Sequence, residues 1–108
     1  MPSLVSITLV TYNSARFIEP CLQSIFAQQY QPLEVIVVDN ASRDSTGEVL
    51  ARYGDRIRII WNQENLGFAA AHNQAIAASS GEWVLVLNPD VQLTARFAAR
   101  LVEAGEEY

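Results

Sequence analysis

Four short apolar runs, separated by longer amphipathic stretches, follow one another along the chain. Each run has the length of a β-strand and is rich in the aliphatic residues that strands favour. The runs cover residues 4–10, 34–38, 57–61 and 83–87. The last run has no polar position, which is typical of a strand covered on both faces, whereas the third alternates and suits the edge of a sheet.

The stretches after the first two runs carry helix signals. Apolar residues spaced for one helical face predict a helix from near Arg16 or Phe17 to near Gln29, with Pro20 in its first turn. Ser45 and Glu48 form a capping-box pattern that opens a short helix closed by Gly54.

Two further helices are expected in the second half of the chain. An alanine-rich helix is predicted over residues 68–79, and a last helix capped by Thr94 follows the fourth run. The apolar positions expected to face the core are Ala69, Ala70, Ile76 and Ala77 in the first, and Phe97, Leu101 and Val102 in the second.

A strand followed by a helix, four times over, predicts an α/β fold with a parallel sheet, right-handed crossovers and helices on both faces. A chain of 108 residues is long enough for one domain. Four strands make a thin sheet, so we expect a partial domain. With the strand order 3-2-1-4, a crevice opens between the first and fourth strands, where the winding reverses.

Polar residues stand at the ends of three predicted strands. Because the carboxyl ends of parallel strands share one edge, these residues are expected to line the crevice together. They are Thr11, Tyr12 and Asn13 after the first strand, Asp39, Asn40 and Ser42 after the second, and Asn88 and Asp90 after the fourth. Pro89 holds Asn88 extended, which presents both neighbouring side chains to a ligand.

The net charge and the absence of two phosphate-binding motifs restrict which ligands this chain could bind and how it could bind a diphosphate. The net charge is −5 and the seven basic residues are all arginine, which disfavours nucleic acid and anionic membranes as partners. The sequence has no Walker A loop and no Gly-x-Gly-x-x-Gly after the first strand. A bound diphosphate must therefore be neutralised by a metal, by arginine or by helix amino-termini, which favours Asp90 as a metal ligand. The single Cys21 is expected to be a small buried hydrophobe in a reducing compartment.

Four motifs in this order resemble the nucleotide-sugar-binding half of glycosyltransferase family 2, whose inverting enzymes have the Rossmann-like GT-A fold. The resemblance covers residues 4 to about 95. The motifs are Val5-Ser-Ile-Thr-Leu-Val-Thr-Tyr-Asn13, Glu34-Val-Ile-Val-Val-Asp-Asn-Ala-Ser42, Asn65-Leu-Gly-Phe-Ala-Ala-Ala-His-Asn73 and Leu87-Asn-Pro-Asp90. The last motif stands where the family carries its Asp-x-Asp metal motif.

The resemblance implies a role for each matching position. Thr11 and Tyr12 would line the nucleoside pocket, and Asp39 would accept the N3–H of a uracil or thymine ring. Asn65 and Gly67 would shape the loop beside the nucleotide, with Asn73 bracing it. Asp90 would coordinate Mn²⁺ or Mg²⁺ on the diphosphate.

The chain departs from the family pattern in two ways. Asn88 replaces the first acid of the metal motif, a form that resembles the rhamnosyltransferase-like branch and implies a dTDP-rhamnose donor. The family's acceptor site and catalytic base come from chain beyond this motif, whereas Glu103, Glu106 and Glu107 are expected to be solvated charges. We therefore expect residues 1–108 to be a donor-binding portion without a catalytic residue, inactive alone, of an enzyme acting on a glycan or lipid-linked acceptor.

Other interpretations stay open at this point. Asp39 fits a local Asx turn, and His72 fits helix packing better than catalysis. A stand-alone nucleotide-sugar binding module shares every motif with the enzyme, whereas a nucleotidyltransferase would need a glycine-rich loop that residues 11–16 lack. The resemblance implies a cytoplasmic protein, either free or peripheral at the inner face of the membrane, and leaves a homo-oligomer open.

Overall fold

The computed structural model describes residues 2–106 and contains one parallel sheet with the strand order β3-β2-β1-β4. This order confirms the expected arrangement. The strands are β1 (Val5–Thr11), β2 (Leu33–Asp39), β3 (Arg58–Trp61) and β4 (Trp83–Leu87). The helices are α1 (Ile18–Phe26), α2 (Thr46–Ala51), α3 (Phe68–Ala78) and α4 (Phe97–Glu106), with a 3-10 turn, η1 (Gly54–Arg56), before β3.

The central strand β1 sets the register of the sheet. Its residues pair with β2 from Val5 opposite Leu33 to Thr11 opposite Asp39, and with β4 up to Leu9 opposite Leu87. The carboxyl ends of β1 and β2 are therefore level. β4 ends two residues short of Thr11, so the segment from Asn88 onwards leaves the sheet beside the last residues of β1.

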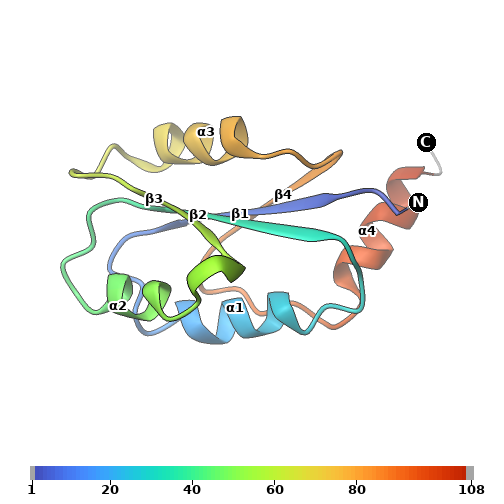
Figure 1. The fold of residues 1–108 in the computed structure, drawn as a ribbon, viewed down its shortest axis with the longest axis horizontal. Coiled ribbons are helices and arrows are strands. Elements are labelled where there is room, and N and C mark those ends of the chain that lie inside the picture. The colour runs from blue at the N-terminus through green and yellow to red at the C-terminus, as the bar shows by residue number, and fades with distance from the viewer. Residues whose placement is uncertain (1, 107–108) are drawn as a thin grey trace.

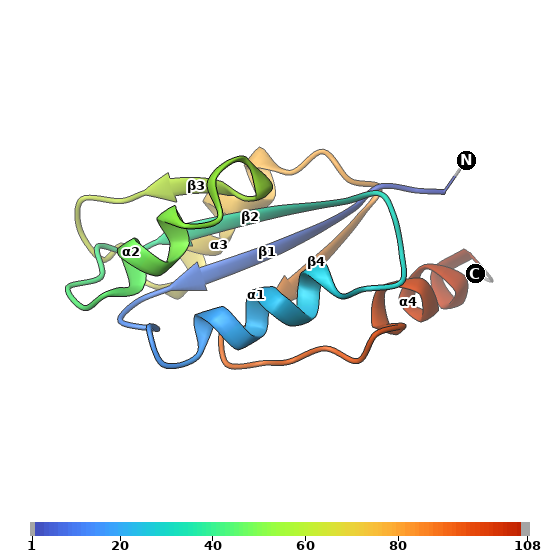
Figure 2. The same cartoon turned by 60° about the horizontal axis from the view of Figure 1, so that its bottom comes forward.

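Helices cover both faces of the sheet, and Figure 1 shows α1 and α2 on the side opposite α3. Alternate strand residues pack with α1 and α2 into the larger apolar cluster, which includes Ile7, Leu9, Leu22, Ile25 and Val37. The smaller cluster lies under α3. The last helix, α4, lies beyond the end of the sheet where the strands begin (Figure 2). None of the helices within residues 2–106 has the length and apolar character needed to cross a bilayer.

The prediction that β4 is covered on both faces is wrong. Val84 and Val86, which point to the α3 side, are 39% and 45% exposed. The reason is the position of α3, which contacts β1 and β2 and leaves the edge strand β4 open on that side. The other edge, β3, is partly exposed as its alternating pattern predicted.

The predicted core face of α3 is wrong, and that of α4 is wrong in part. In α3 the buried residues are Ala71, His72 and Ala75, while all four predicted positions are exposed, namely Ala69, Ala70, Ile76 and Ala77. Alanine on every side gives this helix no distinct apolar face in the sequence, so the choice is made by close packing on the sheet. In α4 Ala98 and Val102 are buried, and Phe97 is exposed.

The predicted Ser45 capping box does not form, because Ser45 makes no capping hydrogen bond to α2. Asp44 takes that role, and its Oδ1 accepts a hydrogen bond from the amide of Thr46 at 2.9 Å. Both residues are typical helix caps, and sequence spacing alone does not decide between neighbours.

Candidate functional site

The ends of β1 and β2 are joined by a side-chain contact. Thr11 Oγ1 donates to Asp39 Oδ1 at 2.7 Å, and the amide of Asn40 donates to the Thr11 carbonyl at 2.9 Å. The structure therefore brings together the ends of the first two strands, as the parallel order predicted.

Asp39 lies at the centre of this junction and is only 3% exposed. Besides Thr11, it accepts hydrogen bonds from the amide and the hydroxyl of Ser42, at 3.0 and 2.6 Å. The carboxylate thus makes the local Asx-type turn that was one of the two interpretations. Since a carboxylate offers about four lone-pair positions, Oδ2 keeps one for a further donor.

Asn13 and Ser42 also meet. The amide of Asn13 donates to Ser42 Oγ at 2.9 Å, and Asn13 Oδ1 accepts from the amide of Arg43 at 2.8 Å. Asn13 and Ala41 have φ of 49° and 60°, a left-handed conformation that costs about 1–2 kcal/mol for alanine. Two such residues side by side are typical of a functional loop held in place by its surroundings.

A second set of polar residues, not singled out from the sequence, supports the loop after β1. The amide of Ser14 donates to Thr46 Oγ1 at 2.8 Å, and the Thr46 hydroxyl in turn donates to Asp44. The Thr46 hydroxyl and the amides that Asp44 accepts hydrogen bonds from lower the pKa of that carboxyl. The signal in the sequence is the polar cluster before α2, which gives no indication that its partner is Ser14.

The loop between β3 and α3 forms the next wall. Gly67 has φ of 87°, a conformation that favours glycine, and its amide donates to Asn65 Oδ1 at 2.8 Å. Its carbonyl accepts from Nδ2 of the buried Asn40 at 3.2 Å. The predicted residues Asn40, Asn65 and Gly67 therefore lie together, and Asn73 stays exposed on α3.

These walls border a cavity of about 330 Å³ that is open to solvent. It lies at the carboxyl end of the sheet and is lined by Val10, Tyr12, Ser14, Asn40, Asn65, Gly67, Phe68 and Pro89. Tyr12 is 47% exposed, so its ring is free to pack against a ligand. No carboxylate is among the lining residues, all of which belong to the described part of the chain.

Asn88 and Asp90 flank Pro89 at the rim, and both side chains are exposed. Burial, with a smaller contribution from the charge of Asp90, raises the pKa of the Cys21 thiol to about 11, which confirms Cys21 as a buried neutral residue. Within residues 2–106 no cluster of three or more His, Cys, Asp or Glu side chains could hold a metal. A lone carboxylate beside an amide does fit a magnesium-like ion whose remaining ligands are phosphate oxygens and water.

Two other groups lie outside the cavity lining. His72 is buried in the packing of α3 against the ring of Phe68, and burial lowers its pKa. Glu103 pairs with Arg96 at 3.5 Å on the exposed surface of α4, and Glu106 is exposed there too, as expected for solvated charges, while Glu107 lies outside the described residues.

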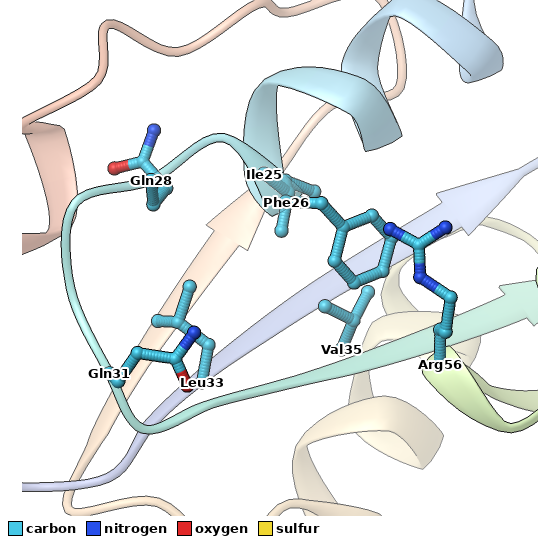
Figure 3. A pocket seen from close by; sticks show the side chains of 7 residues that line it. All are labelled: Ile25, Phe26, Gln28, Gln31, Leu33, Val35 and Arg56. Atoms are coloured by element: carbon cyan, nitrogen blue, oxygen red, sulfur yellow. The ribbon is translucent and has the colours of Figure 1, made fainter.

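A second cavity of about 220 Å³ opens between α1, η1 and the first residues of β2, at the other end of that strand. Figure 3 shows Arg56 over the ring of Phe26 with Val35 of β2 beside them, and Leu33 next to Gln31. None of the residues expected to bind a ligand lines this cavity, so the carboxyl end of the sheet is the better candidate site.

The model of the family described as "Glycosyl transferase family 2" matches residues 6–108. This chain belongs to glycosyltransferase family 2. Glycosyltransferase GlyG of Streptococcus pneumoniae is 30% identical over 93 residues, which are 83% of this chain and 31% of the relative. Succinoglycan biosynthesis protein ExoO of Rhizobium meliloti is 34% identical over 103 residues, 94% of this chain and 30% of the relative.

Solved glycosyltransferases share the fold. The structure of S. aureus TarS 1–349 in complex with UDP-GlcNAc superposes with a TM-score of 0.88 at 26% identity, covering 95% of this chain and 31% of that one. A mannosyltransferase from Pyrobaculum calidifontis in complex with GDP-Man and Mn²⁺ gives a TM-score of 0.85 at 32% identity, covering 98% and 32%. The family 2 domain described here thus has a GT-A-like sheet, and it spans about a third of the length of these relatives.

Proposed function

We propose that this chain is the donor-binding part of an inverting glycosyltransferase that transfers a sugar from a nucleoside diphosphate to a glycan or lipid-linked acceptor. The observation that carries the proposal is the cavity at the carboxyl end of the sheet, where Tyr12, Asn40, Asn65 and Gly67 converge. Its support is the family membership and the UDP-GlcNAc and GDP-Man complexes of the structural neighbours.

In this proposal the nucleoside occupies the cavity. The exposed ring of Tyr12 packs against the base or ribose. Asp39 is 3% exposed and does not line the cavity, so its proposed bond from Oδ2 to the N3–H of a uracil or thymine ring requires the base to reach past the lining residues. Thr11 and Ser42 hold Asp39 through the hydrogen bonds described above, and the amide of Asn13 donates to Ser42 in turn. Asn73 is exposed, so its proposed bracing role depends on ligand-bound geometry.

The diphosphate lies towards Asp90 and Asn88. Asp90 would supply a carboxylate oxygen to Mn²⁺ or Mg²⁺, and that ion would neutralise the diphosphate leaving group. Asn88, a neutral side chain, would bond a ribose or sugar hydroxyl. The Asn-Pro-Asp form motivates dTDP-rhamnose as the specific donor, within a broader class of UDP- and dTDP-linked sugars.

No carboxylate lines the cavity, so the base that deprotonates the acceptor is expected from chain that follows these residues in the relatives. The absence of a carboxylate from the cavity lining also favours one alternative function, a nucleotide-sugar binding module without catalysis. For the whole protein we propose a cytoplasmic location, free or peripheral at the inner face of the membrane.

The test is thermal unfolding of the chain with UDP, dTDP, GDP or ADP, each with and without Mn²⁺. A uridine or thymidine diphosphate is expected to raise the melting temperature, and Mn²⁺ to increase the shift. Asp90→Ala should remove most of the Mn²⁺-dependent part, whereas Asp55→Ala, an exposed acid of η1, should not. Stabilisation by ADP alone, or by none of the four, would contradict the proposal.

A further inference from the structure

Three side-chain amides form a continuous chain behind the wall of the cavity. Asn62 Nδ2 donates to Gln74 Oε1 at 2.8 Å, and Gln74 Nε2 returns a hydrogen bond to Asn62 Oδ1 at 3.0 Å. Asn62 Nδ2 also donates to Oδ1 of Asn40 at 2.9 Å. Both hydrogens of the Asn62 amide and its oxygen are therefore used, which joins the end of β3 to α3 and to the end of β2.

The network of side-chain amides extends through Asn40 to the loop that lines the cavity. Asn40 Nδ2 donates to the carbonyl of Gly67 at 3.2 Å, and the amide of Leu66 approaches Asn40 Oδ1 at 3.5 Å. Gly67 and Asn65 both line the cavity, whereas Asn62 and Gln74 do not. The position of the wall thus depends on two residues that have no contact with the cavity.

The direction of these bonds couples the three residues. Each side-chain amide has a donor end and an acceptor end, and every contact in this hydrogen-bond network joins a donor to an acceptor. Rotating one side-chain amide by half a turn exchanges its oxygen and nitrogen. Each of its contacts would then bring together two donors or two acceptors. The backbone amide of Asn62 is also fixed, because it donates to the Asp39 carbonyl at 2.9 Å. The network therefore favours one position of the loop over its alternatives.

We propose that Asn62 and Gln74 are positioning residues that hold the wall formed by Asn65 and Gly67 in the geometry that binds a nucleoside diphosphate. The inference rests on the proposed function of the cavity. It assigns a role in ligand binding to a pair that no sequence motif marks, with Asn62 directly after β3 and Gln74 in α3.

The experiment measures UDP affinity by calorimetry and amide hydrogen exchange for the chain and for Gln74→Met, which keeps the side-chain length and removes the amide. We expect about tenfold weaker UDP binding, the loss that one or two hydrogen bonds give. Without ligand, the amides of Leu66 and Gly67 should exchange about tenfold faster, with those of Ile7 and Val37 unchanged. Gln63→Met, an exposed residue of the same loop, is the matched control and should change neither quantity.

A rescue variant separates positioning from general stability. The exchanged pair Asn62→Gln with Gln74→Asn keeps two facing amides, and it should recover most of the affinity lost in Gln74→Met. If Gln74→Met does not fold, Gln74→Glu keeps the acceptor and removes the donor, and the same weakening is expected. Unchanged UDP affinity and unchanged loop exchange in a folded variant would overturn the inference. Failure of the unmodified chain to bind UDP would count against the proposed function, and the loop exchange would still decide the role of the pair.

Discussion

At the scale of single residues, Asp39 combines two roles that looked like alternatives. Its hydrogen bonds to Thr11 and Ser42 make it part of the turn after β2. In the proposed function its remaining lone pair would also accept a hydrogen bond from a base. A buried carboxylate that is held by three donors has a fixed orientation, which is what selective recognition of a base N–H needs.

We predict that Asp39→Ala lowers the preference for UDP over ADP more than it lowers the dependence on Mn²⁺. The same change should reduce the free energy of unfolding by about 1–3 kcal/mol, because the buried Thr11 hydroxyl loses its partner. Titration calorimetry and urea unfolding measure the two effects. An equal loss of affinity for every nucleotide would argue against contact with the base.

At the scale of elements, the sequence predicted the sheet well because its signals are local. The strands and Pro20 in the first turn of α1 follow from apolar run length and helix spacing, whereas the strand order was assumed from the doubly wound α/β pattern. Whether a face is covered depends on a distant element, so the exposure of Val84 and Val86 could not be predicted from β4 itself.

The site residues also divide into those predicted from local sequence and those that depend on distant contacts. Tyr12, Asn40, Asn65 and Gly67 gather at one cavity because polar residues after parallel strands share an edge. The supporting contacts were not predicted, since Ser14 to Thr46 and Asn62 to Gln74 join residues 32 and 12 positions apart. Motifs identify the residues beside a ligand, whereas the residues that hold them are found only from coordinates.

The open face of β4 gives a prediction for two neighbouring residues. Val86→Thr should change the free energy of unfolding by no more than about 0.5 kcal/mol, whereas Leu87→Ala should cost about 2–4 kcal/mol. Leu87 is 6% exposed and belongs to the larger apolar cluster. Urea unfolding of both variants is the measurement, and equal costs would mean that the exposed face is covered in solution.

The burial of His72 in α3 predicts a pH dependence. Burial lowers its pKa in the folded state, so below the ordinary histidine pKa of about 6.5 the unfolded chain binds a proton that the folded chain does not. Stability contributed by the neutral side chain is therefore lost as the pH falls below that value. His72→Leu should show a smaller loss of unfolding free energy between pH 7 and pH 5 than the unmodified chain, and an identical pH profile would contradict the prediction.

At the scale of the whole molecule, the candidate cavity and the last helix lie at opposite ends of the sheet. The cavity lies at the carboxyl end of the sheet, while α4 lies beyond the other end (Figure 2). The chain spans about a third of its relatives, and its cavity has no carboxylate lining. Nucleotide binding and sugar transfer are therefore expected to be separable properties.

We predict that the 108-residue chain binds UDP but transfers no sugar from UDP-GlcNAc to an acceptor. Mass spectrometry of incubations with Mn²⁺ and a glycan acceptor measures transfer, and the melting-temperature shift with UDP serves as the control for a folded site. Product formation above the level of a protein-free incubation would show that a base is present within this chain.

The half-exposed ring of Tyr12 belongs to neither apolar cluster. An exchange at this position is therefore expected to have little effect on folding, while it would change the surface that a base meets in the proposed function. Related proteins can therefore change their choice of donor by single substitutions at exposed positions of the cavity, because such substitutions need no compensating changes in the apolar core.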